Sequence, residues 1–177
     1  MITLAERITT ELGSLVGQPI VECSRAANMQ MFGFGTLQKK TNRKGEVVEV
    51  SQLSLHIQCR WRLVDANSIV FGRDDLLYPA DDAIPWDDFD WDKNPSVLDV
   101  VQLEWFAQRL LRPLKVVSAC GDNYGGFQIS LGGDFGLEAF PCDSRRGEYS
   151  EHWRLFGHRD DGSHFVITGD GVLGGDT

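Results

Sequence analysis

Carboxylates and aromatic rings gather in one short stretch of this sequence, PADDAIPWDDFDWDKNPS at residues 79–96. Residues 74–92 contain eight Asp and no Lys or Arg, so this segment carries −8 of the net charge of −9. Aromatic anchors dominate the energetics of protein interfaces, and charges beside them steer an oppositely charged partner and speed encounter. The stretch therefore predicts a surface for a basic protein partner, formed by Trp86, Asp87, Asp88, Phe89, Asp90, Trp91 and Asp92.

The same stretch has two other interpretations. It is also compatible with a solvated acidic loop whose aromatic side chains pack inward. The alternation of Asp88, Asp90 and Asp92 with Asp99 overlaps the spacing of an EF-hand calcium loop, but Lys93 stands where that loop needs Gly. We therefore expect no metal at this position.

A second candidate site is a row of polar side chains in LSLHIQCRWRL, residues 53–63. Apolar residues alternate with polar ones throughout, which predicts one long strand with one face in the core. The planar fork of an arginine suits a carboxylate or phosphate, so the alternative hypothesis is a small module that binds an anionic ligand. The outward face of an antiparallel sheet ordinarily carries a polar row of this kind. In another interpretation, the acidic stretch folds back on the arginines of this row. The row consists of His56, Gln58, Arg60 and Arg62, and Arg73 and Arg154 could join it.

Other classes of function lack a signal. The sequence has neither a GxSxG elbow nor a P-loop, and no nucleophile stands beside a base, so we expect no catalytic residue and no cofactor. The four cysteines form no CxxC pair, which predicts reduced, buried thiols rather than a metal site. The acidic charge disfavours nucleic acid as a partner.

The predicted location is the cytoplasm. No apolar run approaches the ~20 residues needed to span a bilayer, so a membrane is not an expected partner. The beginning of the sequence, MITLAERITTELG, lacks a basic region followed by an apolar one, so no signal peptide is predicted. Oligomeric state stays open.

Elements on either side position these candidate sites. Thr3 with Glu6 predicts a capped helix over 4–16, and Ser96 with Asp99 predicts a second capped helix from 97 to Pro113. The second helix is apolar over a wide arc, so we expect the rest of the protein to cover most of it. Short extended segments separated by Gly, Asp and Asn predict an antiparallel arrangement. The fold class is α+β: a mostly antiparallel β sandwich or partly open barrel with two helices packed on it. Residues 1–170 form one domain, and 171–177 form a flexible tail.

Five stretches in consistent order resemble a family of uncharacterised small bacterial proteins: SRAANMQMFGFG (24–35), SLHIQCRWRL (54–63), WDKNPSVLD (91–99), LEAFPCDS (137–144) and EHWRLF (151–156). The resemblance implies no activity and gives no residue a catalytic role. Acidic cytoplasmic bacterial domains of this size often occur as immunity proteins beside secreted toxins, an analogy that agrees with the acidic stretch. The leading hypothesis is a non-catalytic interaction protein of the immunity type, and an enzyme is not favoured.

Overall fold

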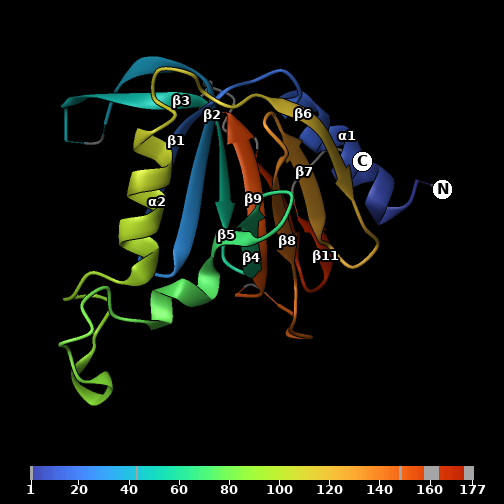
Figure 1. The fold of residues 1–177 in the computed structure, drawn as a ribbon. Helices are drawn as coiled ribbons and strands as arrows, with labels where there is room; N and C mark the ends of the chain where they lie inside the picture. The colour runs from blue at the N-terminus through green and yellow to red at the C-terminus, as the bar shows by residue number, and fades with distance from the viewer. Residues whose placement is uncertain (1, 43, 148, 158–163, 174–177) are drawn as a thin grey trace.

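The computed structural model describes residues 2–42, 44–147, 149–157 and 164–173. Within these ranges the strands form two sheets, and every pair of neighbouring strands is antiparallel (Figure 1). In spatial order, the six-stranded sheet contains β1 (Ile20–Ala26), β2 (Met29–Thr41), β3 (Val47–Ile57), β9 (Glu151–Gly157), β10 (His164–Thr168) and β11 (Gly171–Leu173). The five-stranded sheet contains β5 (Ile69–Gly72), β4 (Arg60–Val64), β8 (Phe135–Phe140), β7 (Phe127–Leu131) and β6 (Val116–Gly121). With two helices added, the predicted α+β class is confirmed, and the sheets do not close into a barrel.

Aromatic side chains from both sheets pack edge to face in the core. Phe32 of β2 meets Trp61 of β4 with ring centroids 5.7 Å apart, and Phe127 of β7 meets Trp153 of β9 at 5.1 Å. Edge-to-face contacts of this kind add stability beyond the area they bury. Trp153 is fully buried, and its indole N–H donates to the carbonyl oxygen of Gly125 at 2.6 Å. The core therefore binds the two sheets together.

The predicted single strand over residues 53–63 is wrong, because the chain changes sheets in the middle of it. β3 ends at Ile57 and β4 begins at Arg60, and the two belong to different sheets. The backbone N–H groups of Gln58 and Cys59 both donate to the carbonyl oxygen of His152, at 2.8 and 3.0 Å. Apolar residues still point into the core on both sides of this corner, so the alternation in sequence continues through it.

Helix α1 (Leu4–Leu12) begins at the predicted cap, with Thr3 and Glu6 bonded reciprocally, and continues as the 3-10 helix η1 (Gly13–Leu15). It packs on β6, where the N–H of Gly121 donates to the hydroxyl of Thr9 at 2.9 Å. A Cβ at position 121 would lie 2.3 Å from a methyl carbon of Ile8. Glycine at this position therefore allows the helix to approach the sheet.

Helix α2 (Val97–Ala107) begins at the predicted cap, formed by Ser96 and Asp99. Its inner side carries the buried Leu98 and Trp105 and contacts β1, β5 and the 3-10 helix η2 (Arg73–Leu77). The expectation that this helix is largely covered is wrong, because Leu103 on the outer side is 69% exposed. The apolar arc of the sequence is wider than the surface available to cover it.

Three smaller expectations can be compared with the structure. Residues 171–173 form β11 beside β10 rather than the flexible tail we predicted, and residues 174–177 lie outside the described part of the chain. The four cysteines are free, as expected, but Cys120 and Cys142 are exposed, not buried. Among the described residues, no helix has the length and apolar character needed to cross a membrane.

Candidate functional site: an acidic loop anchored by Arg25

The acidic stretch forms a closed loop that projects from the body of the protein below α2 (Figure 1). Its two ends are joined, because Pro79 and Ser96 form a β-bridge and the N–H of Ala80 donates to the carbonyl oxygen of Pro95 at 3.0 Å. We call residues 79–95 the acidic loop. A compact surface loop with adjoining ends is an Ω-loop, and such loops frequently carry function.

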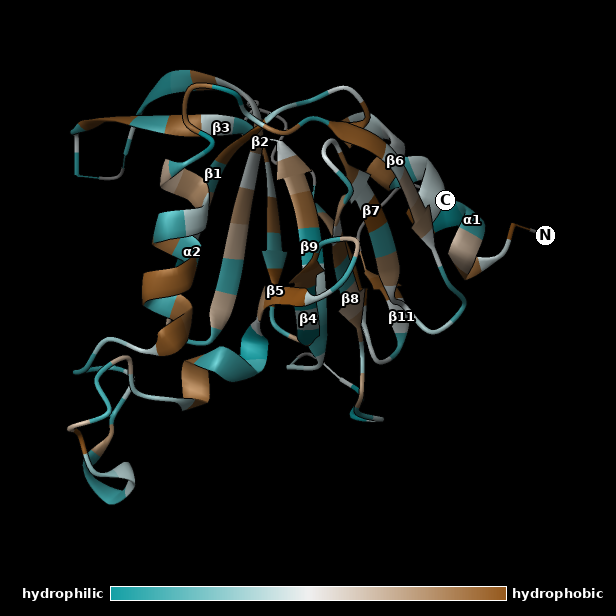
Figure 2. Ribbon diagram, viewed as in Figure 1, coloured by the Kyte–Doolittle hydropathy of each residue, from teal (hydrophilic) through white to brown (hydrophobic). Residues whose placement is uncertain are grey.

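The tip of the acidic loop presents a tryptophan between carboxylates. Residues Trp86–Asp88 form the short 3-10 helix η3, which has hydrophilic colouring in Figure 2. Trp86 is 62% exposed, and its ring meets the ring of Tyr78 edge to face with centroids 5.5 Å apart. Asp87 and Asp88 beside it are exposed. The alternative expectation was that the aromatic side chains of the loop pack inward. Phe89 is partly buried, but Trp86 is exposed.

Several carboxylates of the loop form no hydrogen bond or ion pair within the described part of the chain. Four of them make no hydrogen bond or ion pair with any residue that the structure describes: Asp82, Asp87, Asp88 and Asp92. Asp90 instead binds the ammonium group of Lys93 at 2.6 Å, which lowers the pKa of its carboxyl group. Among the described residues, no group of three or more His, Cys, Asp or Glu side chains is placed to hold a metal ion.

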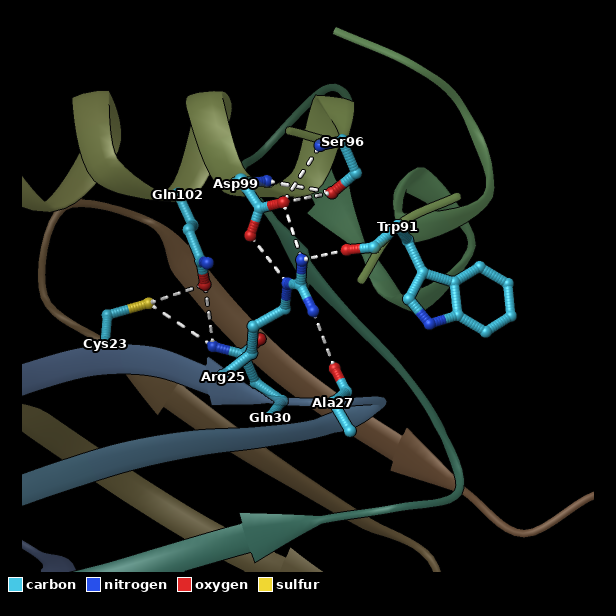
Figure 3. A network of polar contacts seen from close by, with 8 residues as sticks. All are labelled: Cys23, Arg25, Ala27, Gln30, Trp91, Ser96, Asp99 and Gln102. Carbon is cyan, nitrogen blue, oxygen red and sulfur yellow. Dashed lines mark hydrogen bonds and ion pairs between the residues drawn. The ribbon is translucent and has the colours of Figure 1, made fainter. Parts of the chain in front are cut away.

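Arg25 of β1 fixes the base of the acidic loop (Figure 3). Its Nε and Nη2 donate to the two carboxylate oxygens of Asp99 at 2.6 and 2.8 Å, in the bidentate geometry that makes such pairs strong. Nη2 also donates to the carbonyl oxygen of Trp91 at 3.0 Å, and Nη1 donates to that of Ala27 at 2.9 Å. One guanidinium group thus joins the first strand, the second helix and the acidic loop.

Asp99 has two roles at this junction. One of its oxygens accepts from the backbone N–H and hydroxyl of Ser96, which caps α2. Burial alone would raise the pKa of Asp99, but the hydrogen bonds from Arg25 and Ser96 outweigh it and lower the pKa to about 2. The carboxyl group is therefore ionised at neutral pH and holds both the cap and the guanidinium.

A buried polar cluster lies behind Arg25. Gln30 of β2 is buried, and its side-chain amide donates to the carbonyl oxygen of the buried Gln102 of α2 at 3.0 Å. The thiol of Cys23 donates to the same oxygen at 3.8 Å, and burial raises the pKa of that thiol to about 12. These contacts fix α2 against β1 and so hold the start of the helix where Arg25 can reach it.

The polar row His56, Gln58, Arg60 and Arg62 does not form one site. His56 lies on the six-stranded sheet, edge to face with Phe156 at 4.8 Å. Arg60 and Arg62 lie on the other sheet, where they line one pocket of about 260 Å³. Both already bind carboxylates, Arg60 that of Asp74 and Arg62 that of Glu138.

The other two arginines of that hypothesis lie in different places. Arg154 is the neighbour of His56 across β3 and β9, and it binds Glu151. Arg73, at the start of η2, does lie with Arg60 and Arg62 in the pocket of about 260 Å³, and it also lines a second pocket with Gln58 and Arg60. The acidic loop does not fold back on this row, and its contact with an arginine runs through Arg25. Sequence reasoning missed Arg25, because its partner Asp99 is 74 residues away and already explained as a helix cap.

Comparisons with protein-family models, with curated proteins and with solved structures find no match. The resemblance of the five stretches to a bacterial family therefore stays a prediction.

Proposed function

We propose that this protein is a non-catalytic interaction protein, of the immunity type, that binds a basic protein partner through the tip of the acidic loop. The observation that carries the proposal is the exposed Trp86 directly before the exposed Asp87 and Asp88, on a loop whose base is fixed by Arg25. A large aromatic side chain already held in place loses little conformational freedom on binding. Carboxylates that form no ion pair with the described residues can steer and pair with the cationic side chains of a partner.

Affinity purification of the tagged protein from its native cells at low salt tests this proposal. The informative variants are Trp86→Ala and the double variant Asp87→Asn/Asp88→Asn. Loss of a central aromatic anchor typically costs at least about 2 kcal/mol of binding free energy, or roughly thirtyfold in affinity. Both variants should therefore fail to retain a partner that the wild type retains in stoichiometric amount.

Matched controls test whether binding depends on this surface or on any exposed ring or negative charge of the protein. Tyr124, on the turn between β6 and β7, is 85% exposed, so Tyr124→Ala removes an equally available ring far from the loop in sequence. The double variant Glu49→Gln/Asp134→Asn removes the same amount of charge from two exposed positions outside the loop. Both controls should retain the partner, and raising the salt concentration should weaken its binding to wild type. Equal retention by all five proteins, or no partner on the wild type, would contradict the proposal.

A further inference from the structure

The corner at which the chain passes from one sheet to the other encloses a polar pocket of about 290 Å³. The corner residues Gln58 and Cys59 form one side of it and the start of η2 another, and a third side consists of Cys142, Asp143, Arg145, Tyr149, Glu151 and His152. A volume of this size is at the lower end of pockets that take small molecules. The ionisable side chains of Arg, Asp, Glu and His that line it are Arg60, Arg73, Arg145, Asp143, Glu151 and His152.

Arg73 is the unusual member of this lining. Its Nε–H is buried and has no hydrogen-bond acceptor, and its guanidinium group makes no ion pair with any described residue. A buried donor without an acceptor is costly, and in native proteins such a group calls for a specific explanation, such as an ion that belongs to the site. The guanidinium group also lies near the thiol of Cys59. Burial raises the pKa of that thiol to about 12, and the positive charge of Arg73 acts in the opposite direction.

The carboxylates around Arg73 are engaged elsewhere. Asp74 binds Arg60, and Asp75 accepts from the backbone N–H of Gly72 at 2.8 Å. Inside the pocket, Asp143 lies 3.7 Å from Arg145. Glu151 binds Arg154 and accepts from the amide of Gln58 at 3.0 Å. Three arginines and two carboxylates line the pocket, so its lining has one positive charge in excess, and Arg73 is the arginine without an ion pair to a described residue.

We propose that this pocket binds a small anion through a carboxylate or phosphate group that pairs with Arg73. The planar fork of an arginine matches either group and can bind it through two parallel hydrogen bonds. The net charge of −9 and the small volume exclude a long polyanion such as nucleic acid. The site is separate from the acidic loop, so this proposal stands or falls independently of the protein partner.

Thermal unfolding in sodium chloride, phosphate, acetate and citrate at matched ionic strength tests the proposal. A ligand that binds only the folded state raises the melting temperature in a concentration-dependent and saturable manner. Phosphate and citrate also stabilise proteins generally through exclusion from the surface, so the comparison between variants is decisive. Wild type should gain a saturable shift in phosphate or in a carboxylate, and whichever anion gives it identifies the source of the oxyanion. Arg73→Met should lose that shift.

The matched control is Arg62→Met, which removes an arginine of β4 that binds Glu138 and does not line this pocket. It should keep the anion-dependent shift. The proposal is overturned if wild type shows no saturable shift in any of the anions, or if Arg73→Met shows the same shift as wild type.

A titration of isotope-labelled wild type followed by NMR keeps the test decisive even if Arg73→Met does not fold. Inorganic phosphate or acetate should move the backbone amide signals of Gln58, Arg73 and His152 to a saturating end point. Signals that move only elsewhere, or none that move, would refute an anion site at this corner.

Discussion

Arg25 and Arg73 are two partly buried arginines that show how differently one chain can treat the same side chain. Arg25 is only 15% exposed in its side chain, and both carboxylate oxygens of Asp99 and two backbone carbonyls accept its hydrogen bonds. Arg73 has a buried N–H with no acceptor. A cation whose hydrogen bonds are all made within the chain holds the structure together, whereas one without partners is available to a ligand. We therefore assign Arg25 to the architecture of the acidic loop and Arg73 to a pocket.

The largest expected effect is that of Arg25→Met. The substitution leaves Asp99 partly buried without its cation and removes the donors to Trp91 and Ala27, so we expect a loss of about 2–3 kcal/mol in the free energy of unfolding. Urea unfolding measures it. A loss below about 0.5 kcal/mol, the range of an ordinary surface substitution, would show that Arg25 is not the anchor.

Acid should weaken the same junction. The pKa of Asp99 is lowered from 3.8 to about 2 in the folded protein. Its contribution of about 2 kcal/mol is therefore complete above about pH 4 and is lost as the pH falls toward about 2. The difference in unfolding free energy between wild type and Asp99→Asn should narrow steadily over that range. A difference that stays constant would mean that the ion pair does not carry this stability.

The smallest effect is expected for Arg73→Met in the absence of small oxyanions. Because the substitution breaks no ion pair and removes a buried donor without an acceptor, unfolding free energy should stay equal or rise by up to about 1 kcal/mol. Urea unfolding in chloride buffer measures it beside Arg25→Met. If Arg73→Met is as destabilising as Arg25→Met, the contrast between the two arginines is wrong.

Local features of the fold could be predicted from the sequence. Both helix caps, Thr3 with Glu6 and Ser96 with Asp99, depend on residues three apart, and both are present. The α+β class and the antiparallel strands followed from alternation and turn residues. The acidic stretch was recognised from its carboxylates and aromatic residues, and its use as a partner surface stays a prediction.

Features set by distant parts of the chain could not be predicted. The corner at Gln58 and Cys59 depends on the carbonyl oxygen of His152, and alternation cannot reveal it, because inward and outward positions continue on both sides. The anchoring of the acidic loop depends on Arg25, a strand residue with no distinguishing neighbour in sequence. The exposure of Leu103 depends on how much of α2 the edges of the two sheets can cover.

The order of the strands also bears on how the chain folds as it is synthesised. The six-stranded sheet is built from β1 to β3 and from β9 to β11, so the five-stranded sheet, β4 to β8, lies between its two halves in the chain. The pairing of Ile57 with Trp153 cannot form until β9, which follows all of the five-stranded sheet, has left the ribosome. Until then β3 has an unpaired edge, which is open to pairing with other chains. During synthesis the five-stranded sheet can form first, and the last strands then close this edge.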